Sequence, residues 1–210
     1  QLLKKYPNAK IFAIDLSKDM LMYYKKNFSN QINKGQIKIA IGNAEKINEY
    51  TNQRYDIIFI SSALWDLEIE STIKNISKIL KKDGTIVFNL PTLIVGKEKG
   101  FIFFIEHFFR QTLNSKMIYR RIKIDYLKKI AKKYNFNLEF IKEYSFKMSK
   151  RNVAKFFDVL RYRYPFILFP KEISYEKKLR KWTEIFKESL KYIPKDGIDE
   201  AGFIFILKKE

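Results

Sequence analysis

The chain has 210 residues, 46% hydrophobic and 16% aromatic, a composition typical of a globular domain that buries about 70% of its unfolded surface. The absence of cysteine excludes disulfides, thiolate-bound zinc or iron–sulfur clusters and a Cys nucleophile, and we expect no metal site. The longest apolar runs, such as Phe101–Ile105, are far shorter than the roughly 18–20 residues that cross a membrane. Because no signal-like segment opens the chain, we expect a cytoplasmic protein.

The net charge is +19, yet only 8 of the 42 basic residues are arginine. Arginine is the side chain that reads phosphate and guanine in a bidentate geometry, so its scarcity weakens a nucleic-acid interpretation. Three interpretations of the charge stay open. The surface lysines reflect composition alone, or they meet an acidic partner or substrate, or they meet an anionic membrane surface.

Short apolar runs alternate with helical periodicity in the first half of the chain, which predicts βα units and a parallel sheet. The expected strands are 10–15, 37–42, 55–62 and 85–91. The expected helices are 17–28, where Ser17 is the N-cap, and 71–81, which the Asp83-Gly84 pair should end. The apolar runs of the third and fourth strands are nearly continuous, as in strands that are covered on both faces.

The pattern changes after Pro91. Phenylalanines at helical spacing in 101–109 predict an apolar lid helix within segment 92–121. A helix should follow and end before Asn135, and we expect Asn135 itself to adopt a left-handed conformation. We expect an α/β core over 1–149, a helical cap insertion over 150–197, and a final strand of the core over 198–210. The second helix of the cap is expected to bury Leu179, Trp182, Phe186 and Leu190.

Asp15 closes the first strand, in the stretch KIFAIDLSKDML. In open α/β sheets, ligands bind beyond the carboxyl ends of the strands, and a carboxylate placed there accepts hydrogen bonds from both hydroxyls of a ribose. A structural interpretation is also open, in which Asp15 only begins the turn before the next helix.

The chain closely resembles the class I S-adenosylmethionine-dependent methyltransferases, nearest to the small-molecule branch called methyltransferase type 11. The resemblance rests on four stretches in the family's order, YPNAKIFAIDLSKDML, IKIAIGNAEKI, YDIIFISSALWDL and ILKKDGTIVFNLP. It implies a Rossmann-like fold, S-adenosylmethionine as cofactor and Asp15 as the ribose ligand. Asn43 replaces the family's Asp and still offers an acceptor to the adenine amino group. The residues that the resemblance places at the cofactor are Asp15, Leu16, Met20, Gly42, Asn43, Ala44, Ser61 and Ser62.

The family's first strand and its glycine-rich loop, G-x-G-x-G, have no counterpart in this sequence. The 7 glycines are scattered, and the chain begins with Gln1 inside what resembles the helix after that loop. We therefore expect a chain that lacks its N-terminus, or a degenerate homologue. In the family's strand order, 3-2-1-4-5-7-6, the missing strand is central, so its neighbours should have unpaired edges. We expect impaired cofactor binding in these 210 residues.

Methyl transfer from a sulfonium is an in-line displacement that depends mainly on alignment. His107, the sole histidine, is a candidate catalytic base, beside its interpretation as a partly exposed surface residue. The Asn/Asp-Pro-Pro-Tyr/Phe motif that marks amino-methylation of DNA bases is absent, and methylation at pyrimidine C5 through a Cys adduct needs a Cys. We expect a small, lipid-like or carrier-bound apolar acceptor under the aromatic lid and cap.

Two alternative functions stay open. An RNA-modifying methyltransferase would use the charge and the interleaved RYRYPF stretch of 161–166, and its RNA binding would fall steeply with salt. A non-catalytic, methyltransferase-like binding subunit would lack the glycine-rich loop in the complete gene as well.

Overall fold

The computed structural model describes residues 2–92, 94–96, 121–160 and 172–210, without the side chains of 19, 140–141 and 157–160. Its strands are β1 Ile11–Asp15, β2 Ile37–Ile41, β3 Tyr55–Ile60, β4 Leu80–Pro91, β5 Phe136–Met148 and β6 Ile198–Lys209. Its α-helices are α1 Leu2–Lys5, α2 Lys18–Asn27, α3 Ser29–Asn33, α4 Ile47–Tyr50, α5 Ile69–Ile79, α7 Ile124–Lys133, α8 Lys150–Leu160 and α10 Tyr175–Tyr192. Two short 3₁₀ turns are η1 Ala44–Lys46 and η2 Leu64–Asp66.

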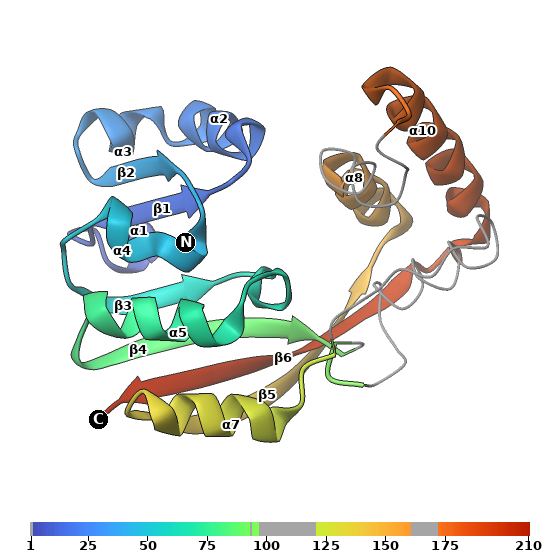
Figure 1. The fold of residues 1–210 in the computed structure, drawn as a ribbon. Helices are drawn as coiled ribbons and strands as arrows, with labels where there is room; N and C mark the ends of the chain where they lie inside the picture. Colours follow the sequence, from blue (N-terminus) through green and yellow to red (C-terminus); the bar gives the residue numbers. More distant parts are fainter. Residues whose placement is uncertain (1, 93, 97–120, 161–171) are drawn as a thin grey trace.

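The strands form two sheets that lie in one row (Figure 1). β1 pairs with β2 in parallel, and the second sheet has the order β3-β4-β6-β5. β3 and β4 are parallel, while β6 runs antiparallel to both β4 and β5. This row, β2-β1 followed by β3-β4-β6-β5, corresponds to the strand order expected from the resemblance. The central strand of that order has no counterpart among the described strands. The predicted α/β fold with a mostly parallel sheet is confirmed.

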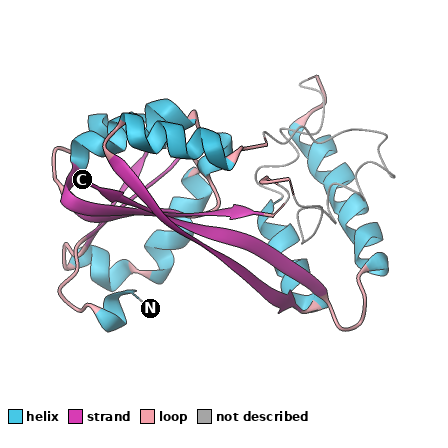
Figure 2. Ribbon diagram, turned by 90° about the horizontal axis from the view of Figure 1, so that it is seen from below, coloured by secondary structure: helices cyan, strands magenta, loops and turns pink. Residues whose placement is uncertain are grey.

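The core lies between the four-stranded sheet and the two helices α5 and α7, which cover the same face of that sheet (Figure 2). Both helices are amphipathic, and α5 buries Ile73 and Ile76 while α7 buries Leu127 and Ile130. Burial of such side chains contributes roughly 1.5–3 kcal/mol each. The sheet is therefore a rigid platform, and the carboxyl ends of β3 and β4 are fixed by it.

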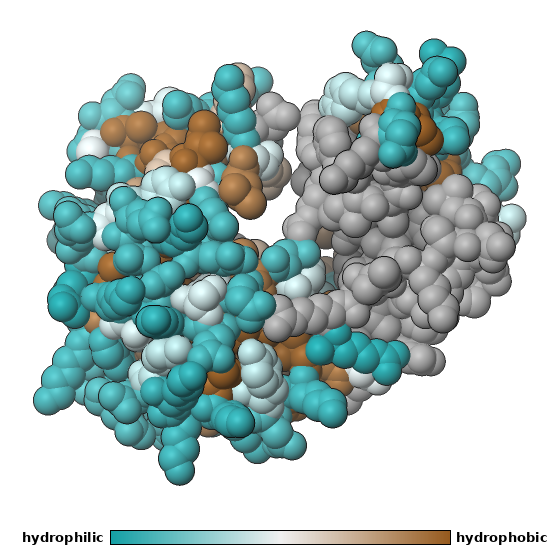
Figure 3. All heavy atoms as spheres, in the orientation of Figure 1, coloured by the Kyte–Doolittle hydropathy of each residue, from teal (hydrophilic) through white to brown (hydrophobic). Residues whose placement is uncertain are grey.

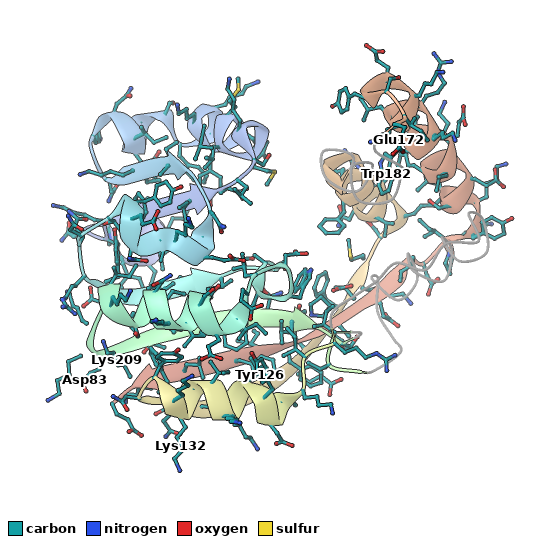
Figure 4. All side chains as sticks on the ribbon, in the orientation of Figure 1. Asp83, Tyr126, Lys132, Glu172, Trp182 and Lys209 are labelled. Atoms are coloured by element: carbon teal, nitrogen blue, oxygen red, sulfur yellow. The ribbon has the colours of Figure 1, made fainter. Side chains whose placement is uncertain are left out.

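Lys209, at the end of β6, ties the last strand to α5 (Figure 4). Its ammonium donates to the carbonyl oxygens of Ser77, at 2.6 Å, and Leu80, at 3.1 Å. A cation at a helix C-terminus satisfies unpaired carbonyls and interacts favourably with the helix dipole. The contact holds the end of the chain against the core.

The turn expected at Asp83-Gly84 lies inside β4 rather than before it. β4 starts directly after α5, and its pairing with β3 jumps from Tyr55↔Leu80 to Ile57↔Thr85. Residues 81–84 therefore bulge out of the ladder, with Asp83 at φ 62. Helix α5 also begins at Ile69, earlier than expected, since the apolar stripe extends to that buried residue.

β5 and β6 form a long antiparallel pair that extends beyond the core, and α8 and α10, which come between them in the chain, lie at its far end (Figure 2). These helices fall in the segment expected as a cap. α10 buries Lys178, Trp182, Ile185 and Ser189. Of the expected apolar stripe, Trp182 is buried, and Leu179, Phe186 and Leu190 are half-buried. Among the described residues, no helix is long and apolar enough to cross a membrane.

Candidate functional site

Asp15 is the last residue of β1 and is exposed at the carboxyl edge of the sheet. Its Oδ1 accepts a hydrogen bond from the Ser17 amide at 2.8 Å. Ser17 is the N-cap of α2, and its Oγ accepts from the Met20 amide at 3.2 Å. Asp15 thus has the structural role of beginning the turn before α2. The same hydrogen bond fixes its carboxylate at the strand end and leaves the lone pairs of Oδ2 available to a ligand.

Apolar side chains surround Asp15 on the surface. Leu16 is 70% exposed and Ile41, the residue paired with Asp15 in β2, is 57% exposed. Met20 is also exposed, and Figure 3 shows hydrophobic side chains gathered over the β1–β2 unit. A carboxylate beside exposed apolar surface is the arrangement that suits a nucleoside, because the ribose needs acceptors and the base needs apolar contact.

Gly42 follows β2 and lies beside Asp15, since its amide donates to the Asp15 carbonyl at 3.0 Å. A Cβ at this position would lie 2.3 Å from Cζ of Tyr50. The ring of Tyr50 thus packs on position 42, and a larger residue there would displace the end of this exposed side chain. Sequence reasoning placed Gly42 at the cofactor, and the structure adds this packing contact.

Asn43 is the N-cap of η1, where its Oδ1 accepts from the Glu45 amide at 2.9 Å. Ala44 begins that 3₁₀ turn and is half-buried. The side-chain oxygen expected to meet an adenine amino group is thus already engaged through one lone pair, and one lone pair is left.

The turn after β2 is anchored to α5. The Glu45 Oε1 accepts from the Glu68 amide at 2.8 Å, and Asn75 Nδ2 donates to the Glu45 carbonyl at 2.7 Å. These contacts connect the β1–β2 unit to the four-stranded sheet through its covering helix. The two groups of candidate residues, around Asp15 and around Ser62, are therefore parts of one framework.

Ser61 and Ser62 follow β3 at the same edge of the row, where β1, β3 and β4 all end (Figure 1). Ser62 has φ 50, a left-handed conformation that is uncommon for a side chain other than Gly, Asn or Asp. Its amide donates to Asn89 Oδ1 at 2.8 Å, and its Oγ accepts from Asn89 Nδ2 at 3.0 Å. Among the described residues, the Ser62 group and the Asp15 group share no hydrogen bond.

Tyr144 of β5 completes this polar cluster, because Asn89 Nδ2 also donates to its hydroxyl at 3.3 Å. Burial raises the pKa of the Tyr144 hydroxyl, the hydrogen bond from Asn89 lowers it, and the charge of Glu200 raises it, with a net rise. Sequence reasoning missed Asn89 and Tyr144. The signal for Asn89 was a single polar residue within the apolar run TIVFNL, and no local signal existed for Tyr144.

His107, the lid helix and the RYRYPF stretch lie outside the described residues. So do most of the phenylalanines that were expected to line an acceptor pocket.

Residues 1–88 match the methyltransferase domain family. The chain is 30% identical over 89 residues to the malonyl-(acyl-carrier protein) O-methyltransferase of Priestia megaterium, covering 42% of this chain and 30% of that protein. It is 28% identical over 91 residues to the demethylmenaquinone methyltransferase of Leptospira interrogans, covering 43% and 35%. The matched part thus spans about a third of the length of these curated relatives.

Structural similarity extends over the whole chain. An O-methyltransferase of a Brevibacillus brevis multienzyme, solved in complex with S-adenosyl-L-homocysteine, superimposes with a TM-score of 0.53 at 15% identity. The superposition covers 100% of this chain and 61% of that one. At this identity the similarity shows a shared fold, and the resemblance found in the sequence to class I methyltransferases is confirmed.

Proposed function

We propose that this chain, whose residues 1–88 match the methyltransferase domain family, transfers a methyl group from S-adenosylmethionine to a small or lipid-like acceptor. The observation that carries the proposal is Asp15, an exposed carboxylate that ends a parallel strand at the carboxyl edge of the sheet. That place is where open α/β sheets bind ligands.

The adenosine half of the cofactor fits the residues around Asp15. The carboxylate offers acceptors to the ribose hydroxyls, and its orientation is fixed by the Ser17 amide. Leu16, Met20 and Ile41 offer exposed apolar surface to the adenine, and Asn43 keeps an acceptor lone pair. We assign Gly42 and Ala44 to the loop beside the base, and the backbone of Ser61 and Ser62 to the methionine half.

The cofactor supplies the methyl group, and the residues of this chain hold the acceptor and the cofactor in the orientation needed for transfer. A displacement at a methyl carbon is accelerated mainly by holding the nucleophile in line, which contributes several kcal/mol. The carboxyl ends of β3 and β4, which the core holds in place, are suited to that task, and β1 ends at the same edge of the row of strands.

The acceptor class is supported by the relatives. One is named for a malonyl group on a carrier protein and the other for a demethylmenaquinone, so both names describe acceptors that are carrier-bound or apolar. We extend this class to the present chain. No described residue adds support for RNA as the acceptor.

The proposal is tested with excess protein, S-adenosylmethionine labelled with ¹³C in its methyl group, and three acceptors: a malonyl thioester, a demethylnaphthoquinol and bulk tRNA. We expect the label in a small acceptor, at a rate that changes little between 50 and 300 mM salt. Label in tRNA with a steep salt dependence would favour the RNA alternative. Binding of S-adenosylhomocysteine without transfer to any acceptor would favour a non-catalytic subunit.

A further inference from the structure

The side-chain amide of Asn89 in β4 contacts two residues, Ser62 after the neighbouring strand β3 and Tyr144 in β5, which lies beyond β6. The Ser62 backbone amide can only donate, so the side-chain atom that it meets at 2.8 Å must be Oδ1. The other atom is therefore Nδ2, and its two hydrogens point to Ser62 Oγ at 3.0 Å and Tyr144 Oη at 3.3 Å. This orientation of the amide follows from the network itself.

The hydroxyl oxygens of Ser62 and Tyr144 both accept a hydrogen bond from Asn89. This restricts the directions in which their own protons can point. A hydroxyl has one proton and two lone pairs. Since a lone pair of each oxygen is used by Asn89, each proton is directed elsewhere. Within the described part of the chain, neither Ser62 nor Tyr144 donates its proton to another residue. Two donors thus lie within 3.3 Å of a single nitrogen and have no protein acceptor among those residues.

Two locally unfavourable backbone features, at Ser62 and at Gly202, position the hydroxyl groups of Ser62 and Tyr144. Ser62 is held at φ 50, which costs of order 1–3 kcal/mol for a residue other than glycine. The strand β6 has Gly202 opposite Tyr144, and a Cβ there would lie 2.4 Å from Tyr144 Oη. Glycine weakens a strand, but here it lets the tyrosine ring cross β6 and reach Asn89 of β4.

The charge near the pair favours a neutral partner. Burial is the largest cause that raises the pKa of the Tyr144 hydroxyl, and the negative charge of Glu200 raises it further. The hydroxyl therefore keeps its proton, and the negative charge of Glu200 makes a neutral ligand more favourable at this hydroxyl than an anionic one. A carbonyl oxygen accepts two hydrogen bonds and has no net charge.

We propose that Ser62 and Tyr144 bind a neutral carbonyl oxygen of the methyl acceptor, and that Asn89 is the positioning residue that directs both protons to it. The inference rests on the proposed function and narrows its acceptor class to ketones, quinones and thioesters. Ser62 follows β3 by two residues, at the edge of the sheet where the methyl group would be presented.

The test uses 1-tetralone labelled with ¹³C at its carbonyl as the probe, and 1-naphthoate as an anion of similar size. Binding to the full chain is measured by NMR without cofactor. We expect a downfield shift of the bound carbonyl signal, because two donors polarise it, and weaker binding of naphthoate. Tyr144→Phe and Ser62→Ala should each reduce tetralone affinity by about fivefold, the value of one hydrogen bond.

Asn89→Asp is the decisive variant, since it keeps the shape of the side chain but replaces the donor by an acceptor. The new carboxylate should accept both hydroxyl protons, so tetralone affinity should fall at least tenfold and the downfield shift should vanish. Tyr6→Phe, an exposed tyrosine elsewhere, should change nothing. An unshifted carbonyl in the wild type, full binding by Asn89→Asp, or naphthoate binding as tightly as tetralone would each overturn the inference. Because the readout needs no methyl transfer, its result is independent of the proposed reaction.

Discussion

Phe12 of β1 and Tyr55 of β3 stack across the division between the two sheets, with ring centroids 6.3 Å apart and an interplanar angle of 28°. The two strands are not hydrogen-bonded to each other. Side chains therefore bridge the place where the sequence predicted a missing central strand. The backbone donors and acceptors that β1 and β3 direct to this place have no partner strand among the described residues, and such groups are costly to bury.

The first prediction concerns cofactor affinity. These 210 residues contain no glycine-rich loop. In the family that the chain resembles, this loop brings the backbone close to the methionine half of the cofactor, and only glycine permits such close contact. We expect S-adenosylhomocysteine to bind with a dissociation constant well above the micromolar range in titration calorimetry. Micromolar affinity would show that the loop is dispensable.

The second prediction concerns self-association. Ile57 and Phe59 of β3 are exposed, with Phe59 at 57%, beside the unpaired edge. Exposed edges with apolar residues pair with other chains. We expect sedimentation velocity to show concentration-dependent oligomers of the wild type. The Ile57→Lys/Phe59→Lys double variant should be more monomeric at the same concentration.

Met22→Lys is the matched control, because Met22 is an exposed apolar residue of α2 away from that edge. It should leave the association unchanged. A wild type that stays monomeric throughout the concentration range is incompatible with this prediction.

The third prediction concerns Gly197, which joins the cap segment to β6. Its φ is +95, and a Cβ would lie 2.0 Å from the Met148 carbonyl oxygen. Gly197→Ala should lower the free energy of unfolding by about 3 kcal/mol, from backbone strain plus overpacking. Gly35 has φ +69 with nothing within 4 Å, so Gly35→Ala should cost about 1 kcal/mol. Urea denaturation measures both, and equal losses would refute the role of the Met148 contact.

The fourth prediction is a dependence of stability on pH through Glu70. Hydrogen bonds from Lys133 and then Tyr134 lower the pKa of the Glu70 carboxyl below its ordinary value of 4.5. A carboxyl with a lowered folded-state pKa contributes stability above pH 4.5 and loses it as the pH falls through the folded value. Glu70→Gln should therefore lose less stability than the wild type between pH 6 and pH 3. The difference should be small, because the pair is exposed and screened. If the stability of the wild type and of Glu70→Gln falls equally between pH 6 and pH 3, Glu70 does not contribute to the pH dependence.

Local sequence patterns predicted the elements well. β1 and β2 were expected within a residue of their observed ends, because a short apolar run followed by a polar turn is typical of a strand. The expectation that the third strand is covered on both faces was wrong, since Ile57 and Phe59 of β3 are exposed beside the place where no strand pairs with it. Asn135 was expected in a left-handed conformation and has φ 59, since Asn tolerates it at a helix end. The division between β1 and β3 was predicted from the family's strand order.

Contacts between distant segments were not predictable in this way. Asn89 meets Ser62 across 27 residues and Tyr144 across 55, and Tyr144 reaches Asn89 only because Gly202 lies between them. No periodicity encodes such a meeting. The buried stripe of α10 was displaced toward Lys178 and Ser189 because packing, rather than hydrophobicity alone, decides which face a helix buries.

The most direct test of the central claim, that Asp15 holds the ribose of the cofactor, is an NMR titration of the wild type and of Asp15→Ala with S-adenosylhomocysteine and its 2′,3′-dideoxy analogue. We expect the wild type to bind the natural nucleoside at least tenfold more tightly than the dideoxy analogue, as expected for hydrogen bonds to a charged acceptor. Asp15→Ala should bind both equally and weakly. Equal binding of both ligands by the wild type, or an unchanged preference in Asp15→Ala, would contradict the account.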